Sequence, residues 1–210
     1  MDPSDDRLPL FPLGLVLLPG EPVPLHIFEP RYREMVALCL DGDRPFGIVH
    51  ASEKAVAEVG TTAWIRRVVT RYEDGRLDIL CVGEARFRVQ HIHRDRAYLS
   101  ATVDLLPSDA DGDAALAQRV VTQHMKLMEM AGEDVSPGLY EPPPAVSYLV
   151  GRNAGLEPDQ KQRLLEMETE TQRLAFLAEH LAGVLSRVRA ARELRDRARG
   201  DGHADGMPEL

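Results

Sequence analysis

The residues of this chain best suited to chemistry are two pairs, each of which contains histidine. His91 and His93 are two positions apart, and on a strand this spacing puts both imidazoles on one face, as a metal pair requires. The sequence does not place a third metal-ligating side chain next to these two histidines. We therefore expect a half-exposed strand and no metal site. Cys39 and His50 could form a nucleophile and its base. Cys39 falls on the apolar face of an expected helix, which favours a buried, inert thiol.

Motifs of nucleotide-driven or hydrolytic enzymes are missing from the sequence. It contains no G-x-x-x-x-G-K-[ST] phosphate loop and no G-x-S-x-G nucleophile elbow. None of the three lysines lies in a glycine-rich nucleophile context. We therefore expect a protein that is not an enzyme, with no catalytic residues and no cofactor.

The composition is typical of a soluble globular protein. The 210 residues are 44% hydrophobic and 28% charged, and the net charge of −9 disfavours nucleic acid as the main partner. Cys39 and Cys81 lie inside apolar runs, which indicates buried thiols in a reducing compartment. The acidic N-terminus lacks the cationic region of a signal peptide, and no apolar run is long enough to span a membrane. We expect a cytoplasmic protein with no membrane contact.

The elements that must position any site begin with the stretch from Pro9 to Arg33. Five prolines forbid a continuous helix here and leave short extended pieces. Glu29-Pro30 then indicates a helix start. A helix is expected over 31–40, with an apolar face at i, i+3, i+4 and i+7 and with Gly42 as a left-handed cap. The residues of that face are Tyr32, Met35, Val36 and Cys39.

Residues 61–106 show the pattern of successive strands. Apolar residues on both sides of Glu73-Asp74-Gly75 predict a hairpin, and Gly83 is expected to end the strand that follows it. Further strands are expected around Phe87 to His91 and from Tyr98 to Leu106. Strands joined by tight turns, with one helix inserted, predict an antiparallel sheet that closes as a small barrel.

The second half is predicted to be helical. Residues 108–113 form a polar, acidic linker, and 114–199 form a lobe of helices. Thr169 to Gln172 has the form of a capping box, which indicates a fresh helix start. An apolar seam follows at 3-4-3-4 spacing, and a disordered tail is expected over 200–210. The seam consists of Leu174, Leu177, Leu181, Val184 and Val188.

Several motifs, in order along the chain, resemble the N-terminal substrate-binding domain of ATP-dependent Lon proteases. The opening carries Pro9-Leu10-Phe11-Pro12-Leu13, Val16-Leu17-Leu18-Pro19-Gly20 and the block from Pro24 to Tyr32. Later matches are Gly83-x-x-Arg86-Phe87-Arg88-Val89 and Lys161-Gln162-x-Leu164-Leu165-Glu166. The resemblance implies an α+β fold: a PUA-like pseudobarrel within residues 1–107, followed by the helical lobe. It also implies a stand-alone form without the ATPase and peptidase modules of that family.

The function implied by this resemblance is non-enzymatic recruitment of polypeptides, in protein quality control or regulated proteolysis. The partners would be polypeptide clients or a separate protease. Binding is expected at apolar surface beside the barrel and in the cleft between the lobes. The candidate residues are Leu13, Leu15, Phe28, Glu29, Arg31 and Tyr32. The alternative is a small-ligand or RNA-binding regulator on the same barrel, because several arginines lie along the sheet and PUA-like folds include RNA binders. The sequence leaves the client and the oligomeric state open.

Overall fold

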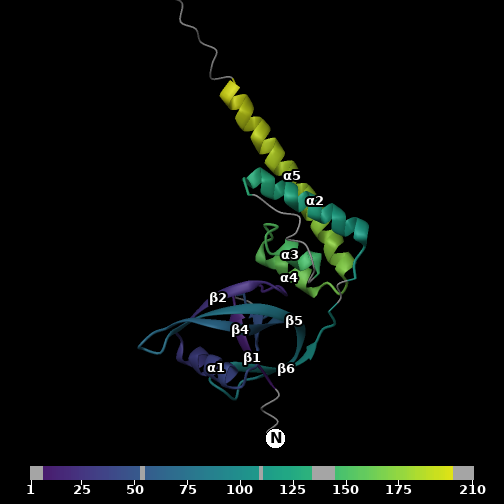
Figure 1. Cartoon of the computed structure of the whole chain (residues 1–210). Helices are drawn as coiled ribbons and strands as arrows, with labels where there is room; N and C mark the ends of the chain where they lie inside the picture. The colour runs from purple at the N-terminus through teal and green to yellow at the C-terminus, as the bar shows by residue number, and fades with distance from the viewer. Residues whose placement is uncertain (1–6, 53–54, 109–110, 134–144, 201–210) are drawn as a thin grey trace, which may run out of the picture.

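The computed structural model describes residues 7–52, 55–108, 111–133 and 145–200. These residues form a strand-rich lobe and a helical lobe stacked end to end, with one long helix pointing away from the strands (Figure 1). The last strand ends at Leu105 and the second helix begins at Ala114, on either side of the expected linker over 108–113. Residues 201–210 of the expected tail lie outside the described residues, and Gly200 is the last residue of a helix.

Six strands make one sheet that closes into a barrel. Its order is β2-β5-β4-β3-β1-β6, and a further pairing of β5 with β6 completes the closure. The fold class, α+β with a strand-rich first half, is confirmed. The sheet is mixed, however, because β1 pairs with β3 in parallel. The chain between these two strands includes β2 and a helix, which is the length of crossover that a parallel pair needs. The strands are β1 (Leu8–Leu13), β2 (Pro22–Ile27), β3 (Phe46–His50), β4 (Val59–Arg71), β5 (Leu77–His93) and β6 (Leu99–Leu105).

Strand β5 continues through Gly83, where the sequence predicted a break. A Cβ at this glycine would lie 2.5 Å from the backbone oxygen of Leu18. The Gly20 N–H also donates to the Gly83 carbonyl oxygen at 2.8 Å, and the Gly83 N–H donates to the Glu21 carbonyl oxygen at 3.0 Å. The glycine therefore lets the turn before β2 approach the strand closely, and it does not end the strand.

Helix α1 (Pro30–Asp41) seals one side of the barrel. Its four predicted face residues are buried, and they pack in one core cluster with Phe11, Ile79 and Phe46. Gly42 is not in the left-handed region: its φ is −91°, and Asp43 takes the positive φ of 42° instead. An aspartate tolerates that conformation better than most residues, so the cap is displaced by one position.

In the described part of the second lobe there are four helices: α2 (Ala114–Ala131), α3 (Val146–Gly151), α4 (Pro158–Glu166) and α5 (Glu170–Gly200). The predicted capping box is present, because Thr169 Oγ1 accepts from the Gln172 N–H at 3.2 Å and Gln172 Oε1 accepts from the Thr169 N–H at 3.1 Å. Leu174, Leu177 and Leu181 are fully buried, as the seam requires. Beyond them Leu185 is the buried residue, while Val184 and Val188 are half-buried.

The two lobes meet at a joint formed by polar contacts and by apolar packing, in which Val16, Leu18 and Val59 lie in the core of the helical lobe. The guanidinium of Arg86, only 5% exposed, donates to the carbonyl oxygens of Leu165, Met167 and Pro107 at 3.0, 2.7 and 3.1 Å. Lys161 of α4 forms an ion pair of 3.1 Å with Glu21, which precedes β2. The Lys161 side chain is 19% exposed, so this ion pair is largely shielded from solvent.

Candidate functional site

An uncovered sheet face runs along three neighbouring strands, and we call it the outer face. Alternate residues of β2, β5 and β4 point away from the barrel core, while Val23, Ile27 and Ile79 point into it. Its members come from β2 and the residue after it, from β5, and from β4 and its turn. They are Pro22, Pro24, His26 and Phe28; Asp78, Leu80 and Val82; and Trp64, Arg67, Thr70 and Tyr72. All of them are half-buried or exposed.

The end of the outer face nearest the β4–β5 hairpin is aromatic. Phe28 is 59% exposed and Tyr72 is 38% exposed. The ring of His26 lies between them, stacked on Phe28 at 6.0 Å and edge-on to Tyr72 at 5.9 Å. Single exposed apolar side chains are ordinary, but three adjacent rings make a contact surface with a polar edge.

Asp78 holds these rings in place. Its carboxylate accepts from Nδ1 of His26 at 2.6 Å and from the Tyr72 hydroxyl at 2.7 Å. These two hydrogen bonds, that from His26 first, lower the pKa of Asp78. The bond to Asp78 in turn raises the pKa of Tyr72. Because the ionised carboxylate can only accept, His26 donates through Nδ1, and Asp78 fixes the orientations of the His26 and Tyr72 rings.

The free edge of β2 is protected against the addition of another strand. β2 ends the strand order and pairs only with β5 among the named strands. Pro22 and Pro24 lack an N–H, so the ladder to β5 must use Val23 and Leu25, and the proline positions face the free edge. An incoming strand would find few donors there. The outer face therefore suits side-chain contact better than strand addition.

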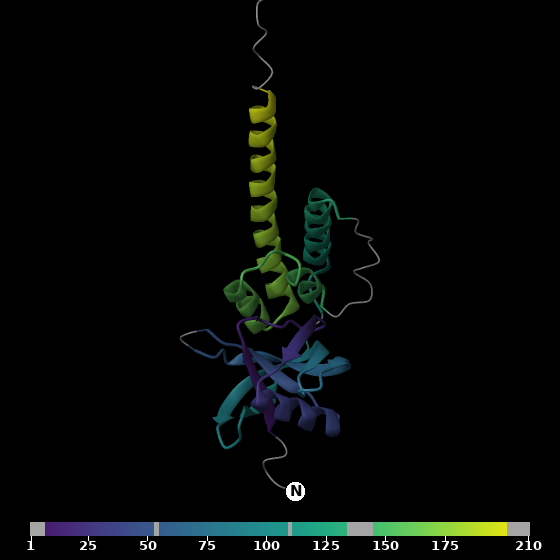
Figure 2. The same ribbon diagram turned by 90° about the vertical axis from the view of Figure 1, so that its left-hand side faces the viewer.

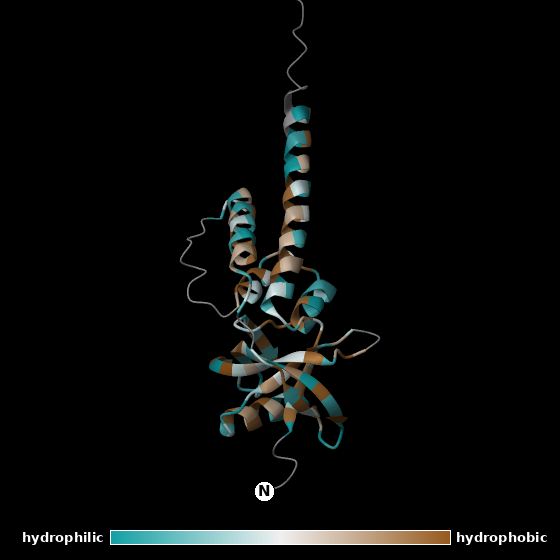
Figure 3. Ribbon diagram, turned by 90° about the vertical axis from the view of Figure 1, so that its right-hand side faces the viewer, coloured by the Kyte–Doolittle hydropathy of each residue, from teal (hydrophilic) through white to brown (hydrophobic). Residues whose placement is uncertain are grey.

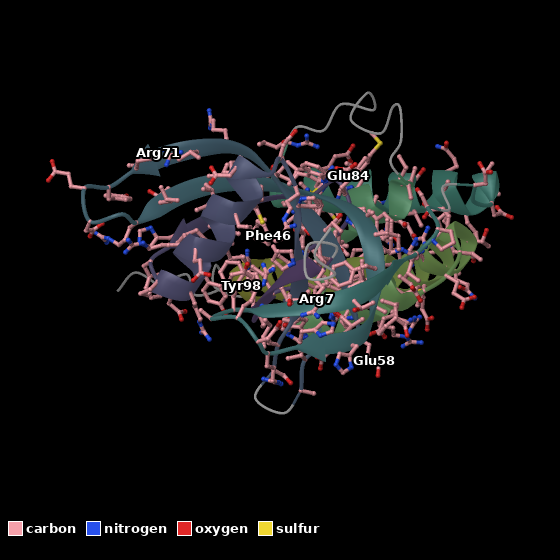
Figure 4. All side chains as sticks on the ribbon, turned by 90° about the horizontal axis from the view of Figure 1, so that it is seen from below. Arg7, Phe46, Glu58, Arg71, Glu84 and Tyr98 are labelled. Atoms are coloured by element: carbon pink, nitrogen blue, oxygen red, sulfur yellow. The ribbon has the colours of Figure 1, made fainter. Side chains whose placement is uncertain are left out.

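The other end of the outer face opens into a cleft between the lobes. The cleft has a volume of about 550 Å³, within the range of small binding sites. Val82 belongs to both surfaces, and Arg86 and Tyr148 connect the cleft to the joint and to α3. Figure 4 shows Arg71 near the hairpin end of this sheet and Glu84 well away from that end. The lining includes Pro19, Gly20, Arg66, Val82, Glu84 and Pro107.

The six residues proposed from the sequence occupy different environments. Phe28 is the exposed apolar member and belongs to the outer face. Glu29 and Arg31 form an ion pair of 2.7 Å beside it, and the Arg31 guanidinium lies 4.5 Å from the centre of the Tyr32 ring. Tyr32 itself is 9% exposed and packs on Phe11 at 4.1 Å between ring centres, which makes it mainly a core residue. Leu13 and Leu15 are half-buried against the same core and are not part of the outer face.

Sequence reasoning missed Pro24, His26, Tyr72 and Asp78. The alternation of Pro22, Pro24, His26 and Phe28 was available as a signal, since alternate strand residues share a face. No signal in the sequence indicated the residues that β5 and the hairpin turn add to this face. Their position depends on the register of the sheet, which pairs His26 with Asp78.

The groups considered for chemistry are placed as follows. Cys39 and Cys81 are buried free thiols, and burial raises their pKa values to about 11 and about 12. The rings of His91 and His93 are 4.6 Å apart, and His93 Nε2 lies 2.9 Å from the Thr102 hydroxyl. Among the described residues, no group of three or more metal-ligating side chains is arranged to hold a metal. None of the described helices is long and apolar enough to cross a membrane.

The arginines along the sheet do not form one cationic surface. Arg86 donates hydrogen bonds to carbonyl oxygens between the lobes, and Arg76 forms an ion pair with Asp74 at 2.7 Å. Arg66 lies 3.9 Å from Glu84. Contacts with RNA phosphates would have to compete with these carboxylates, which weakens the RNA-binding alternative.

Comparison with known proteins gives one consistent result. A family model described as the ATP-dependent protease La (LON) substrate-binding domain matches residues 7–183. A Lon protease from Paraburkholderia phytofirmans is 25% identical over 93% of this chain and 26% of its own length. The protein cereblon from Danio rerio is 34% identical over 50% of this chain and 26% of its own length. The chain thus spans about a quarter of the length of these curated relatives.

A solved structure agrees with the sequence relatives. The crystal structure of a Lon N-terminal domain protein from Xanthomonas campestris superimposes with a TM-score of 0.66 at 27% identity. It covers 81% of this chain and 96% of that one. The similarity therefore extends beyond the strand-rich half into the helical lobe.

Proposed function

The chain belongs to the family of Lon substrate-binding domains, and from this premise we propose that it recruits polypeptides by non-covalent contact through the outer face. The observation that carries the proposal is the cluster of Phe28, His26 and Tyr72 at the surface, in which Asp78 orients the His26 and Tyr72 rings and Phe28 stacks on His26. Preoriented rings lose little conformational freedom on binding, and aromatic residues dominate the binding energy of many interfaces.

The client would be an extended or unfolded polypeptide with apolar side chains. Its side chains would contact the aromatic end of the outer face, and its backbone would run past Leu80 towards the cleft between the lobes. Glu29 and Arg31 would form a polar rim beside Phe28. Delivery of the bound client to a separate protease is part of the proposal, and so is the absence of a chemical step.

A binding titration with a labelled unfolded protein tests this function. The probe is fluorescein-labelled, reduced and carboxymethylated α-lactalbumin, and the readout is fluorescence anisotropy. Phe28→Ala and Tyr72→Ala should each weaken binding about tenfold, the effect of losing one interfacial anchor. Leu105→Ala is the matched control, because Leu105 is 67% exposed but lies on β6, outside the outer face.

The control must bind the probe as tightly as the parent protein. If Phe28→Ala, Tyr72→Ala and Leu105→Ala all bind like the parent, the outer face is not the recruiting surface. If the parent does not bind the unfolded protein at all, recruitment itself is refuted. A structured RNA titrated at low salt tests the alternative, which requires binding that weakens steeply as salt rises.

A further inference from the structure

A second cavity, apart from the cleft between the lobes, opens at the rim of the barrel. Its volume is about 460 Å³, and β1, the turn before β3, β4, β5 and β6 all contribute to its lining. Among the described residues, only those of the strand-rich lobe line it, and the helical lobe stacked on the barrel (Figure 2) does not reach it. The volume is that of a small-molecule site, and such sites often lie in the mouths of β-barrels. We call it the rim pocket.

An irregularity in the ladder between β4 and β5 makes room for the rim pocket. Along β4 the register advances from Thr61 to Ala63, while along β5 it moves back from Arg86 to Gly83. One residue of β4 and two of β5 are therefore outside the regular ladder, and all three line the pocket. Irregularities of this kind at barrel rims redirect side chains and interrupt strand pairing. The three residues are Thr62, Glu84 and Ala85.

Much of the surface of the rim pocket is apolar. Leu8 and Val103 line it and pack against the core cluster inside the barrel, so they form its floor. Trp64 adds a half-buried aromatic ring, and Leu105, 67% exposed, lies at the opening. Figure 3 shows hydrophobic and hydrophilic bands alternating along the barrel strands, as expected when one face of each strand is apolar. A ligand that fills the pocket must therefore have an apolar body.

Arg44 supplies a positive charge next to this apolar surface. It lies in the turn between α1 and β3, and its Nε and Nη2 atoms are buried. It is also close to Cys39, where burial raises the pKa of the thiol to about 11 and the charge of Arg44 acts against that rise. Attraction between an enclosed guanidinium and an anion is less screened than at the surface. The planar guanidinium also matches the two oxygens of a carboxylate.

Two further charged residues line the rim pocket, and neither reverses its sign. Arg7 is the second cation, and it forms an ion pair of 2.9 Å with Asp95. Glu84 is the one acidic residue of the described lining, and its side chain is 57% exposed and 3.9 Å from Arg66. The charge of an exposed carboxylate is screened by water and salt. The more enclosed cation, Arg44, therefore determines which ligands the pocket favours.

We propose that the rim pocket binds a small organic acid, in which an apolar chain or ring carries one carboxylate group. The carboxylate accepts hydrogen bonds from Arg44, and the apolar body lies over Leu8 between Trp64 and Leu105. This site goes beyond the proposed recruitment of polypeptides and does not rest on it. Trp64 is the one residue that the rim pocket shares with the outer face.

A titration of the full chain with octanoate tests the site. The readout is the fluorescence of Trp64, the only tryptophan of the chain, which lines the pocket. An alkyl chain beside the indole excludes water, so the emission should shift to shorter wavelength and saturate with a dissociation constant below about 1 mM. Octanamide has the same chain and a similar shape but no charge, and it should bind at least about tenfold more weakly. Octylammonium, with the opposite charge, should not bind.

Variants of the lining residues identify the contacts. Arg44→Gln should weaken octanoate binding about tenfold, because the enclosed charge is lost. Arg7→Gln should weaken it only about threefold, because Asp95 already compensates that cation. Leu105→Ala removes apolar contact at an exposed position and should also cost about threefold. Arg88→Gln is the matched control, because Arg88 is a half-buried arginine of β5 that does not line the pocket.

Each measurement can overturn the proposal. Octanoate that leaves the Trp64 emission unchanged up to about 10 mM, ten times the expected upper limit of the dissociation constant, refutes the site. Octanamide that binds as tightly as octanoate, or Arg44→Gln that binds octanoate like the parent protein, refutes the recognition of a carboxylate. Circular dichroism confirms the fold of each variant, and if Arg44→Gln does not fold, octanamide together with Arg7→Gln decides. Leu105→Ala separates this site from recruitment, because it should weaken octanoate binding and still bind the labelled unfolded protein like the parent.

Discussion

At the scale of single residues, the most unusual feature is an ion pair buried inside the helical lobe. Arg173 and Glu170 are 0% and 1% exposed, and the Arg173 guanidinium donates to the Glu170 carboxylate at 3.0 Å. The Ser147 N–H donates to the same carboxylate at 2.9 Å, and Arg173 also donates to the Met167 carbonyl at 3.0 Å. Buried charges are tolerated when they are paired and hydrogen-bonded in this way.

Removal of the cation should therefore be costly. Arg173→Met leaves the Glu170 carboxylate buried without its counter-charge, and we expect the free energy of unfolding to fall by about 3–5 kcal/mol. Urea unfolding followed by circular dichroism measures the change. The double variant Glu170→Gln with Arg173→Met removes both charges and should recover part of the loss. A decrease below about 1 kcal/mol for Arg173→Met would show that the pair is solvated in solution.

Single residues were also where sequence reasoning had the least to work with. In the sequence, Arg86 belongs to a motif of the Lon resemblance, and no pattern indicates that Arg173 is buried. The sequence therefore does not show that both guanidinium groups converge on the carbonyls of 165–168. Burial of a charged side chain depends on partners that are distant in sequence, and periodicity carries no information about them. The cysteines were easier, because apolar neighbours on both sides already indicated burial.

At the scale of elements, local patterns predicted what local physics determines. The apolar face of α1, the hairpin at Glu73-Asp74-Gly75 and the capping box at Thr169 all involve residues close in sequence, and the structure confirms them. Gly83 misled because a glycine in a strand marks either a break or a close approach. Only the position of the Leu18 carbonyl decides between these two, and Leu18 lies in the turn before β2, far from Gly83 in the sequence.

Close approach should also make Gly60 of β4 intolerant of a side chain. A Cβ there would lie 2.5 Å from the Ile48 carbonyl oxygen and 2.6 Å from the ring of Phe87. Because the first of these is backbone, β3 and β4 must separate, and Gly60→Ala should lower the free energy of unfolding by about 1–3 kcal/mol. Chemical denaturation measures it. Gly14→Ala is the control, since nothing lies within 4 Å of a Cβ at that position. Equal stability of the two variants would contradict the expectation.

At the scale of the whole molecule, the joint determines whether the lobes behave as one body. Arg86 reaches from β5 into the turn between α4 and α5, and Lys161 and Arg152 reach back to Glu21 and to the Gly20 carbonyl. All of these contacts are polar, and they lie beside the cleft that continues the outer face. The joint therefore positions the cleft walls, and the sequence predicted the cleft but not the residues that hold it in place.

Arg86→Lys should uncouple the lobes without unfolding either of them. A lysine has the same charge, but its single ammonium cannot reproduce the planar fork that contacts the Leu165, Met167 and Pro107 carbonyls. The only tryptophan, Trp64, lies in β4 and reports on the barrel by fluorescence, while far-UV circular dichroism reports mainly on the helices. In the parent protein the two thermal unfolding curves should coincide, as expected for one cooperative unit. In Arg86→Lys the helical signal should be lost first, because α4 and α5 lose their support while the barrel keeps its closed sheet.

Arg88→Lys, two residues further along the same strand and half-buried, should leave the curves superimposed. Coincident curves in Arg86→Lys would mean that apolar packing between the lobes, such as that of Val59 and Leu18 in the helical-lobe core, is sufficient to couple them.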